Sequence, residues 1–234
     1  MTWILANLPL LSSRLLEHLG LALPAIVLSV VLALPLGWIA HRYRVSRWVL
    51  VTLTGLLYAI PSLPLFVLLP ALLGTGIRDA SNAIVALTLY GLALMVRSVA
   101  DALDAVPPLV TDAAKAQGYG PLALVLKVQL PLAVPALTAG ARVVAVSTIS
   151  LVTVSGVLGL PSLGLLFVDG FQRGITEEIV AGLVLTVALA LVLDALLALL
   201  GRAMTPWNRA DPTTRRRAAH TPRTAVAPRA GEAQ

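Results

Sequence analysis

Residues 20–40 read GLALPAIVLSVVLALPLGWIA and contain no ionisable side chain. The hydrocarbon core of a bilayer is about 30 Å thick, and an α-helix of about 20 predominantly apolar residues crosses it. Within that core, only helices and closed barrels satisfy every backbone hydrogen-bonding group. The stretch therefore predicts a membrane-spanning helix from Gly20 to Ala40.

Four further stretches have a similar length and apolar character. They cover residues 48–73, 82–99, 135–158 and 179–200. The composition of the 234-residue chain agrees, because 58% of its residues are hydrophobic and 12% are charged, whereas soluble domains have about 45–50% and about 25%. The sequence predicts an all-α integral membrane protein with about five spanning helices.

The basic residues predict how these helices are oriented. Arg42, Arg44 and Arg47 follow the first span, and repeated arginines follow Trp207. Basic loops remain on the cytoplasmic side, so both regions are expected there. Five spans then place the N-terminus outside and the C-terminus in the cytoplasm. We interpret the net charge of +6 as this topology signal and not as a nucleic-acid-binding surface.

Three parts of the chain differ in composition. Residues 1–19 are Leu-rich and include Trp3, which predicts an interfacial helix. Residues 20–206 form the predicted transmembrane domain, with a cytoplasmic loop at residues 101–130. Residues 207–234 are rich in Pro, Arg, Ala and Thr, so we expect a disordered basic tail that contacts anionic membrane lipid.

Prolines interrupt the second span. A proline removes a backbone donor, and the carbonyl groups that it frees need other partners unless they line a cavity. This favours a kinked helix that lines a pathway at Pro61, Ser62 and Pro64. The alternative is a proline that a membrane helix simply tolerates.

Arg142 and Asp194 lie inside the fourth and fifth spans. Ionisable groups inside a membrane are costly, so they are usually paired or face water. With the predicted topology, both residues fall in the cytoplasmic half of the bilayer. We predict a structural ion pair between them, with a pair that lines a gate as the second interpretation.

Several kinds of chemistry are not supported by the sequence. The chain has no cysteine, which excludes disulfides and thiolate sites. His18, His41 and His220 have no neighbours at metal-ligand spacing, so we predict no metal, no cofactor and no catalytic residues. A membrane enzyme, the competing class, would need clustered His, Asp or Glu at one membrane face. The phosphate-binding loop of ATPases is also absent from the sequence.

The cytoplasmic loop predicts two short helices below the membrane. The Ala-rich stretch from Thr111 favours a helix with Thr111 or Asp112 as its N-cap, and Gly118 is expected to end it. A second helix is expected over residues 122–130, stopping at Pro131. The small side chains of the first helix allow another backbone to approach closely, so the loop is either shaped to bind a partner protein or is an ordinary amphipathic connector between membrane helices.

The spacing of seven residues in this loop is distinctive. The acidic-Ala-Ala triplet precedes a glycine by three residues, and nine more separate this glycine from Val-x-Leu-Pro; the positions are Asp112, Ala113, Ala114, Gly118, Val128, Leu130 and Pro131. This pattern resembles the signature loop of permease subunits of binding-protein-dependent, ATP-driven (ABC) importers, with Asp for the usual Glu and Val for the usual Ile. The resemblance implies a coupling helix seated in a cleft of a separate ATPase subunit.

Further matching motifs extend over residues 14–200. They are Glu17-His18-Leu19, Pro35-Leu36-Gly37, Ile60-Pro61-Ser62-Leu63, Leu130-Pro131-Leu132-Ala133-Val134-Pro135 and Ala139-Gly140-Ala141-Arg142. They resemble the osmoprotectant branch of these permeases, which carries glycine betaine, choline and carnitine. Much of the pattern is also similar to methionine-type importers, so another small solute, such as an amino acid, is the alternative.

The resemblance implies several properties of the chain. The fold would be the methionine-permease-like transmembrane domain of a type I importer, in a bacterial or archaeal inner membrane. The partners would be an ABC ATPase subunit, a second permease that is identical or related, and an extracytoplasmic solute-binding protein. One departure concerns residues 156–164, where fewer glycines and the added Pro161 imply a stiffer outer element.

Overall fold

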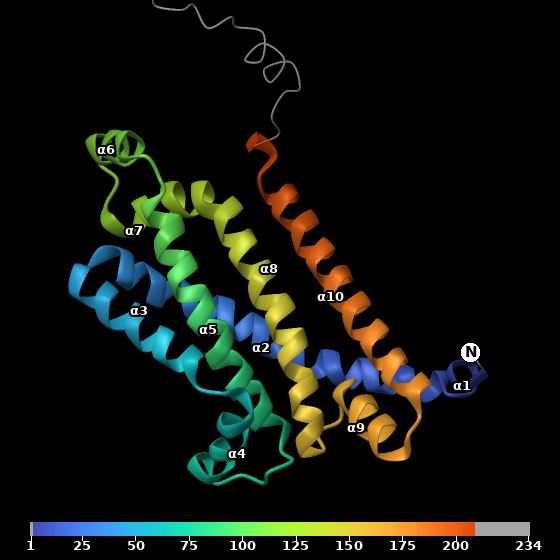
Figure 1. Ribbon diagram of the computed structural model, residues 1–234. Helices are drawn as coiled ribbons and strands as arrows, with labels where there is room; N and C mark the ends of the chain where they lie inside the picture. The colour runs from blue at the N-terminus through green and yellow to red at the C-terminus, as the bar shows by residue number, and fades with distance from the viewer. Residues whose placement is uncertain (1, 209–234) are drawn as a thin grey trace, which may run out of the picture.

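The computed structural model describes residues 2–208, and this part of the chain is helical with short connections (Figure 1). Within it, four helices are long and apolar enough to cross a membrane, and one bent pair of helices makes a fifth candidate span. The predicted all-α fold with about five spans is confirmed. The elements are α1 (Thr2–Ala6), α2 (Leu8–Arg42), α3 (Arg44–Ala59), α4 (Ser62–Leu73), α5 (Ala80–Asp104), α6 (Pro108–Ala116), α7 (Pro121–Leu124), the π-helical turn η1 (Val125–Gln129), α8 (Leu130–Ser155), the 3-10 turn η2 (Gly156–Leu158), α9 (Gly164–Arg173), α10 (Thr176–Met204) and the 3-10 turn η3 (Pro206–Asn208).

Helix α5 forms the centre of the bundle and packs against α2, α3 and α8. Small residues bring α2 and α5 close together: a Cβ atom at Gly37 would lie 2.4 Å from Cβ of Val99, and one at Gly91 would lie 2.0 Å from Oγ of Ser29. Lipid tails are as apolar as the side chains, so membrane helices are held together by such close packing and not by burial alone. Helices α2 and α5 therefore form a tightly packed pair.

Helix α8 runs antiparallel to α5, and α10 packs on α8. The contacts again use glycine: a Cβ at Gly140 would lie 2.9 Å from Cβ of Ser98, and one at Gly201 would lie 2.9 Å from Oγ1 of Thr138. Helices α6 and α7 lie at the end of the bundle where α10 finishes, and α4 and α9 lie at the opposite end (Figure 1). The loop at residues 101–130 and the start of the basic tail thus share one end, as the predicted topology requires.

The N-terminal region differs from the expected division at residue 19. Helix α2 begins at Leu8, with Pro9 in its first turn, and continues without a break to Arg42. Gly20 does not interrupt it, because an isolated glycine costs a helix only about 1 kcal/mol and neighbouring contacts outweigh this. One such contact is Leu11, which is buried with Leu163 of the connection before α9. The expected tail at residues 209–234 lies outside the described residues.

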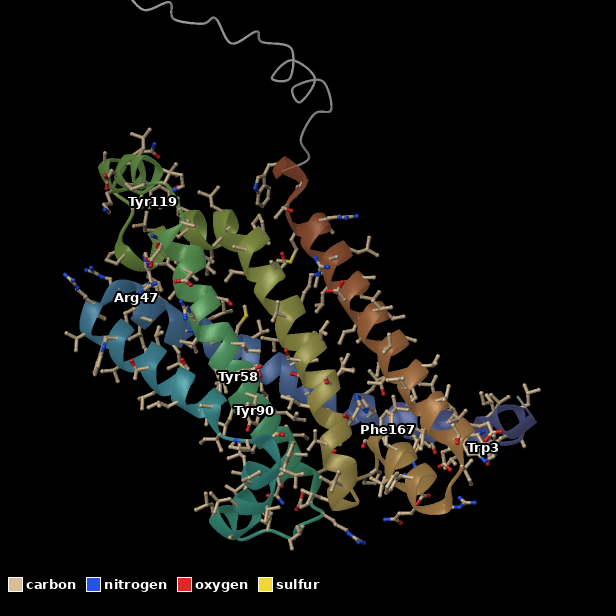
Figure 2. All side chains as sticks on the ribbon, in the orientation of Figure 1. Trp3, Arg47, Tyr58, Tyr90, Tyr119 and Phe167 are labelled. Atoms are coloured by element: carbon tan, nitrogen blue, oxygen red, sulfur yellow. The ribbon has the colours of Figure 1, made fainter. Side chains whose placement is uncertain are left out.

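The second span is broken, as its prolines predicted. Helices α3 and α4 meet at an angle of 104°, and Ile60 before Pro61 has extended backbone angles, as residues before proline prefer. The hydroxyl of Tyr90 donates a hydrogen bond to the carbonyl oxygen of Ile60 at 2.5 Å. The ring of Tyr58 packs edge-on against Tyr90 with a centroid separation of 6.0 Å (Figure 2). A side chain of α5 thus satisfies a carbonyl group that the break leaves without a helical partner.

The end of α8 packs directly on the start of α9. A Cβ atom at Gly164 would lie 2.0 Å from the carbonyl oxygen of Thr153, and one at Gly156 would lie 2.4 Å from the carbonyl carbon of Gly164. These two glycines therefore have a packing role, because backbone meets backbone there. Gly159 has a different role, since its φ of +77° places it in the left-handed region that glycine adopts without strain.

Gly164→Ala is expected to lower the thermal unfolding midpoint of the detergent-purified protein. The added methyl group must displace the backbone of α8, and overpacking of this kind costs about 1–3 kcal/mol. Gly76→Ala is the matched control, because a Cβ atom at Gly76 meets no atom within 4 Å. Equal midpoints for the two variants would contradict the direct packing of α9 on α8.

Candidate functional site

Helix α6 starts three residues earlier than the sequence predicted. Pro107 precedes the helix in an extended conformation, and Pro108 occupies its first turn, where the missing N–H of a proline costs nothing. Thr111 is therefore not a cap, and its hydroxyl donates to the carbonyl oxygen of Pro108 at 2.8 Å. Asp112 also lies inside the helix, where its carboxylate pairs with Lys115 at 2.9 Å. The prediction of an N-cap at Thr111 or Asp112 is wrong, because the Pro-Pro pair already starts the helix.

Gly118 ends α6, as predicted. Its φ is +87°, and its N–H donates to the carbonyl oxygen of Lys115 at 2.9 Å, while the N–H of Tyr119 donates to that of Ala114 at 3.2 Å. These two bonds make a Schellman motif, in which a left-handed residue, usually glycine, closes the last turn. Gly118 thereby fixes where α6 ends and how the chain turns back toward the membrane.

One side of α6 exposes small and apolar side chains together with Asp112. Ala113, Ala116 and Gly118 are exposed, and Leu109 is 82% exposed in the first turn. Residues 109, 112, 113 and 116 share one side of the helix, because positions three and four apart lie above one another. We call Leu109, Asp112, Ala113, Ala116 and Gly118 the docking surface. The sequence reasoning missed Leu109, since it started the helix at residue 111.

Other residues of the predicted motif face inward. Ala114 is buried, and it lines a hollow beside α6 together with Leu109 and Ala113 of the docking surface and Val128 of η1. Leu130 and Pro131 lie in the first turn of α8 and line a groove that α2 and α10 also border. In the second half of the motif, Val128 thus borders the docking surface, whereas Leu130 and Pro131 lie in the membrane helix α8.

The helix does not stop at Pro131, contrary to the sequence prediction. Residues 125–129 form a π-helical turn, in which the N–H of Leu130 donates to the carbonyl oxygen of Val125. This wider turn leads directly into α8, with Pro131 in its first turn. A proline clashes with the carbonyl group four residues before it in a regular α-helix, and π-helical turns are frequent at functional sites. The wider turn lets the chain continue past the proline.

A polar cluster joins this turn to three membrane helices. Nδ1 of His41 donates to Asp104, Arg47 donates to Asp104 and, at 2.6 Å, to Asp101, and Nε2 of Gln129 lies 3.4 Å from Nε2 of His41. The sequence reasoning assigned Arg47 to topology only and missed the other members. The available signal was the spacing of Asp101 and Asp104, which places two carboxylates on one side of α5 near a basic loop.

Arg142 and Asp194 form the predicted ion pair between α8 and α10. Nε and Nη2 of Arg142 donate to the two carboxylate oxygens of Asp194, each over 2.7 Å. Such bidentate contacts are stronger and more directional than single ones. Asp194 also lines a cavity of ≈ 620 Å³ between α8 and α10, whose wall carries the hydroxyl groups of Ser150, Thr153 and Thr186.

The other predicted pathway residues lie elsewhere. Pro61 precedes α4, and Ser62 and Pro64 belong to its first turn, at the bend with α3. Pro61 and Pro64 are exposed and Ser62 is half-buried. The bend packs on α5 through Tyr90, whereas the ion pair connects α8 to α10. A pathway role for either group stays a prediction.

No group of three or more His, Asp or Glu side chains that could hold a metal ion occurs in the part of the chain that the structure describes. His41 belongs to the polar cluster, and His18 is buried in α2. His220 lies outside the described residues. The geometry thus defines a class of protein: a multi-pass membrane protein that exposes a short helix with small and apolar side chains at one end of its bundle.

Comparison with known proteins identifies the family. Residues 33–208 match the binding-protein-dependent transport system inner membrane component family, and the chain belongs to this family. It is 32% identical to the osmoprotectant import permease protein OsmW of Salmonella typhimurium, over 87% of this chain and 96% of that protein. It is 30% identical to the choline transport system permease protein OpuBB of Bacillus subtilis, over 81% of this chain and 86% of that protein.

The fold has a counterpart among solved structures. The inward-facing MetNI methionine ABC transporter superposes with a TM-score of 0.74 and 25% identity, over 86% of this chain and 98% of that one. The chain is therefore a multi-pass inner-membrane protein with the transmembrane fold of an ABC importer. Its family consists of transporter permease subunits and not of enzymes.

Proposed function

We propose that this permease subunit carries a small compatible solute, such as glycine betaine, choline or carnitine, into the cell. An extracytoplasmic binding protein delivers the solute, and a separate ABC ATPase supplies the energy. The names of the relatives support the solute class, since one is an osmoprotectant permease and another a choline permease. The likeness to a methionine transporter supports the second candidate, an amino acid.

The docking surface supports the ATPase partner. Its exposed side chains are small or apolar apart from Asp112, so a cleft in another protein can receive the helix without burying many charges. Leu109 supplies a large apolar anchor at the start of α6, and the Schellman turn at Gly118 holds the far end. Closure of two ATPase subunits would then move α6, because α6 is bound in a cleft of the ATPase.

A second permease subunit is proposed from the surfaces that the chain leaves open. Helix α3 has no buried residue within residues 44–59. In α10, the most apolar window has no buried residue within the described part of the chain. One set of about five spans lines only part of a pathway, so a second copy or a related chain would complete it.

The cavity between α8 and α10 supports a pathway along these helices. Its wall is largely apolar but carries hydroxyl groups and the carboxylate of Asp194, and ionisable groups at membrane depth mark substrate pathways in many transporters. The bend at Pro61, Ser62 and Pro64 is proposed as a second lining element, because broken helices expose backbone carbonyl groups.

The solute proposal is tested with the complete transporter in proteoliposomes. ATP hydrolysis is measured with the binding protein and glycine betaine, choline, carnitine or methionine in turn. We expect stimulation by at least one quaternary amine and none by methionine. Stimulation by methionine alone would reject the proposed solute class. A rate of ATP hydrolysis that is the same with and without the binding protein would reject the importer mechanism.

A further inference from the structure

Helix α6 carries the docking surface, and we call it the docking helix. It contacts the rest of the molecule through few elements. Helix α6 packs mainly against α7 and η1. A cavity of ≈ 510 Å³ is lined on one side by Lys115 and Tyr119, from α6 and the turn after it, and on another by Trp38 near the end of α2. Part of α6 is therefore separated from the bundle, and a movement of α6 reaches the membrane helices through η1 on one side and through residues 105–107, which join it to α5, on the other.

From η1, a chain of polar contacts leads to three membrane helices. Gln129 is buried at 6% exposure, and its amide faces Nε2 of His41 on α2 at 3.4 Å. The other ring nitrogen of His41 donates to Asp104 on α5. Arg47, in the first turn of α3, donates to Asp104 and to Asp101. These contacts are in addition to the covalent link from η1 to α8.

The solvent exposure of this cluster indicates a role in transmitting movement between helices more than a contribution to the free energy of folding. The side chains of Arg47, Asp101 and Asp104 are 36%, 51% and 43% exposed. Ion pairs with this much solvent contact contribute little to folding. They nevertheless fix the relative positions of the elements that they join, because carboxylate and guanidinium groups pair with defined geometry. The π-helical turn η1 lies next to them, and turns of this kind are frequent at functional sites.

We propose that His41, Arg47, Asp101, Asp104 and Gln129 form a transmission clamp, which passes movement of the docking helix to α2, α3 and α5. This inference rests on the proposed function, because it assumes that α6 is moved by an ATPase. Through the clamp, η1 drives the α2–α3 corner together with the end of α5. Without it, the α2–α3 corner loses its polar connection to η1 and to the end of α5, so ATP is hydrolysed with little solute movement.

The test compares transport with ATP hydrolysis in reconstituted transporter. Gln129→Met removes the amide at similar length, and Asp104→Asn removes the charge that His41 and Arg47 share. Both are expected to lower solute transported per ATP at least about fivefold, equivalent to about 1 kcal/mol of lost coupling. ATPase pull-down and hydrolysis should stay within about twofold of wild type, because neither residue belongs to the docking surface.

Two control variants separate the clamp from a general loss of structure. Gln129→Asn keeps a side-chain amide N–H that can donate to Nε2 of His41, and should retain more of the transport per ATP than Gln129→Met. Arg14→Gln breaks the ion pair of Arg14 with Glu17, which lies within α2 and spans 2.8 Å, and should leave the ratio unchanged. An unchanged ratio in both Gln129→Met and Asp104→Asn would overturn the proposal, as would loss of ATPase binding in either.

A distance measurement tests the clamp without altering it. The chain has no cysteine, so spin labels can be placed at Arg44→Cys and Lys127→Cys, two exposed positions beside the clamp. The distance between the labels should be the same with and without ATP, and should become variable when Gln129→Met is added. A change of this distance on addition of ATP, in labelled protein without the Gln129→Met replacement, would overturn the clamp. Failure of wild-type protein to bind any ATPase would instead reject the proposed function.

Discussion

Gly118→Val is expected to remove ATPase association and, with it, transport. Gly118 has a φ of +87°, and a β-branched residue in this region is a genuine outlier. Leaving the left-handed conformation would break the Schellman bonds of Gly118 and Tyr119 and redirect the end of α6. The strain of about 1–2 kcal/mol falls on an exposed loop, so insertion into the membrane should not change. Pull-down of the ATPase from membranes with equal amounts of permease measures the effect.

Gly120→Val is the matched control for this experiment. Gly120 lies two residues further along the same loop, with ordinary angles of φ −69° and ψ 166°, and an added Cβ atom meets no atom within 4 Å. Valine is tolerated at such a position, so association should be close to wild type. Full association of the Gly118→Val variant would show that α6 is only a connector between membrane helices.

Asp194→Ala is expected to have the second large effect. It leaves the guanidinium group of Arg142 without the carboxylate that accepts both of its hydrogen bonds, at a depth where an unpaired charge costs about 2.5–3.5 kcal/mol. We expect lower yield of folded protein in membranes and a lower unfolding midpoint in detergent. The charge-exchanged double variant, Arg142→Asp with Asp194→Arg, should recover part of both.

A double-mutant cycle quantifies this pair. Single replacements of Arg142 and Asp194 by alanine, together with the double replacement, give the coupling free energy from the unfolding midpoints. A coupling below about 0.5 kcal/mol would contradict a direct interaction, since residues that do not interact have additive effects within that range. If folding recovers in the charge-exchanged variant but transport does not, the pair has a role in the pathway as well as in structure.

The features predicted from sequence were those that local chemistry determines. Uninterrupted apolar length identified the spans, Pro61 identified the bend, and Gly118 identified the end of α6. The pairing of Arg142 with Asp194 was predictable because two opposite charges at one membrane depth have few other partners. Each of these signals lies within one stretch of sequence or depends on one property of the bilayer.

The features that were missed depend on packing between distant segments. The chain continues through Pro131 only because a wider turn precedes it, and the sequence does not state which helical turn forms. The clamp depends on the approach of residue 41 to residues 104 and 129, which no local pattern reveals. Leu109 was missed for a smaller reason: the Pro107-Pro108 pair was not recognised as the start of a helix, although proline favours that position.

The open faces of α3 and α10 have a thermodynamic consequence. Whatever covers these helices, whether lipid, detergent or a second permease subunit, stabilises the folded chain to the extent that it binds this state more strongly than the unfolded one. Mass action then raises the apparent free energy of unfolding with the concentration and affinity of that molecule. The chain therefore has no single intrinsic melting temperature: the value measured after purification describes the chain together with its surrounding amphiphiles, and exchanging one detergent for another shifts it without any change in sequence.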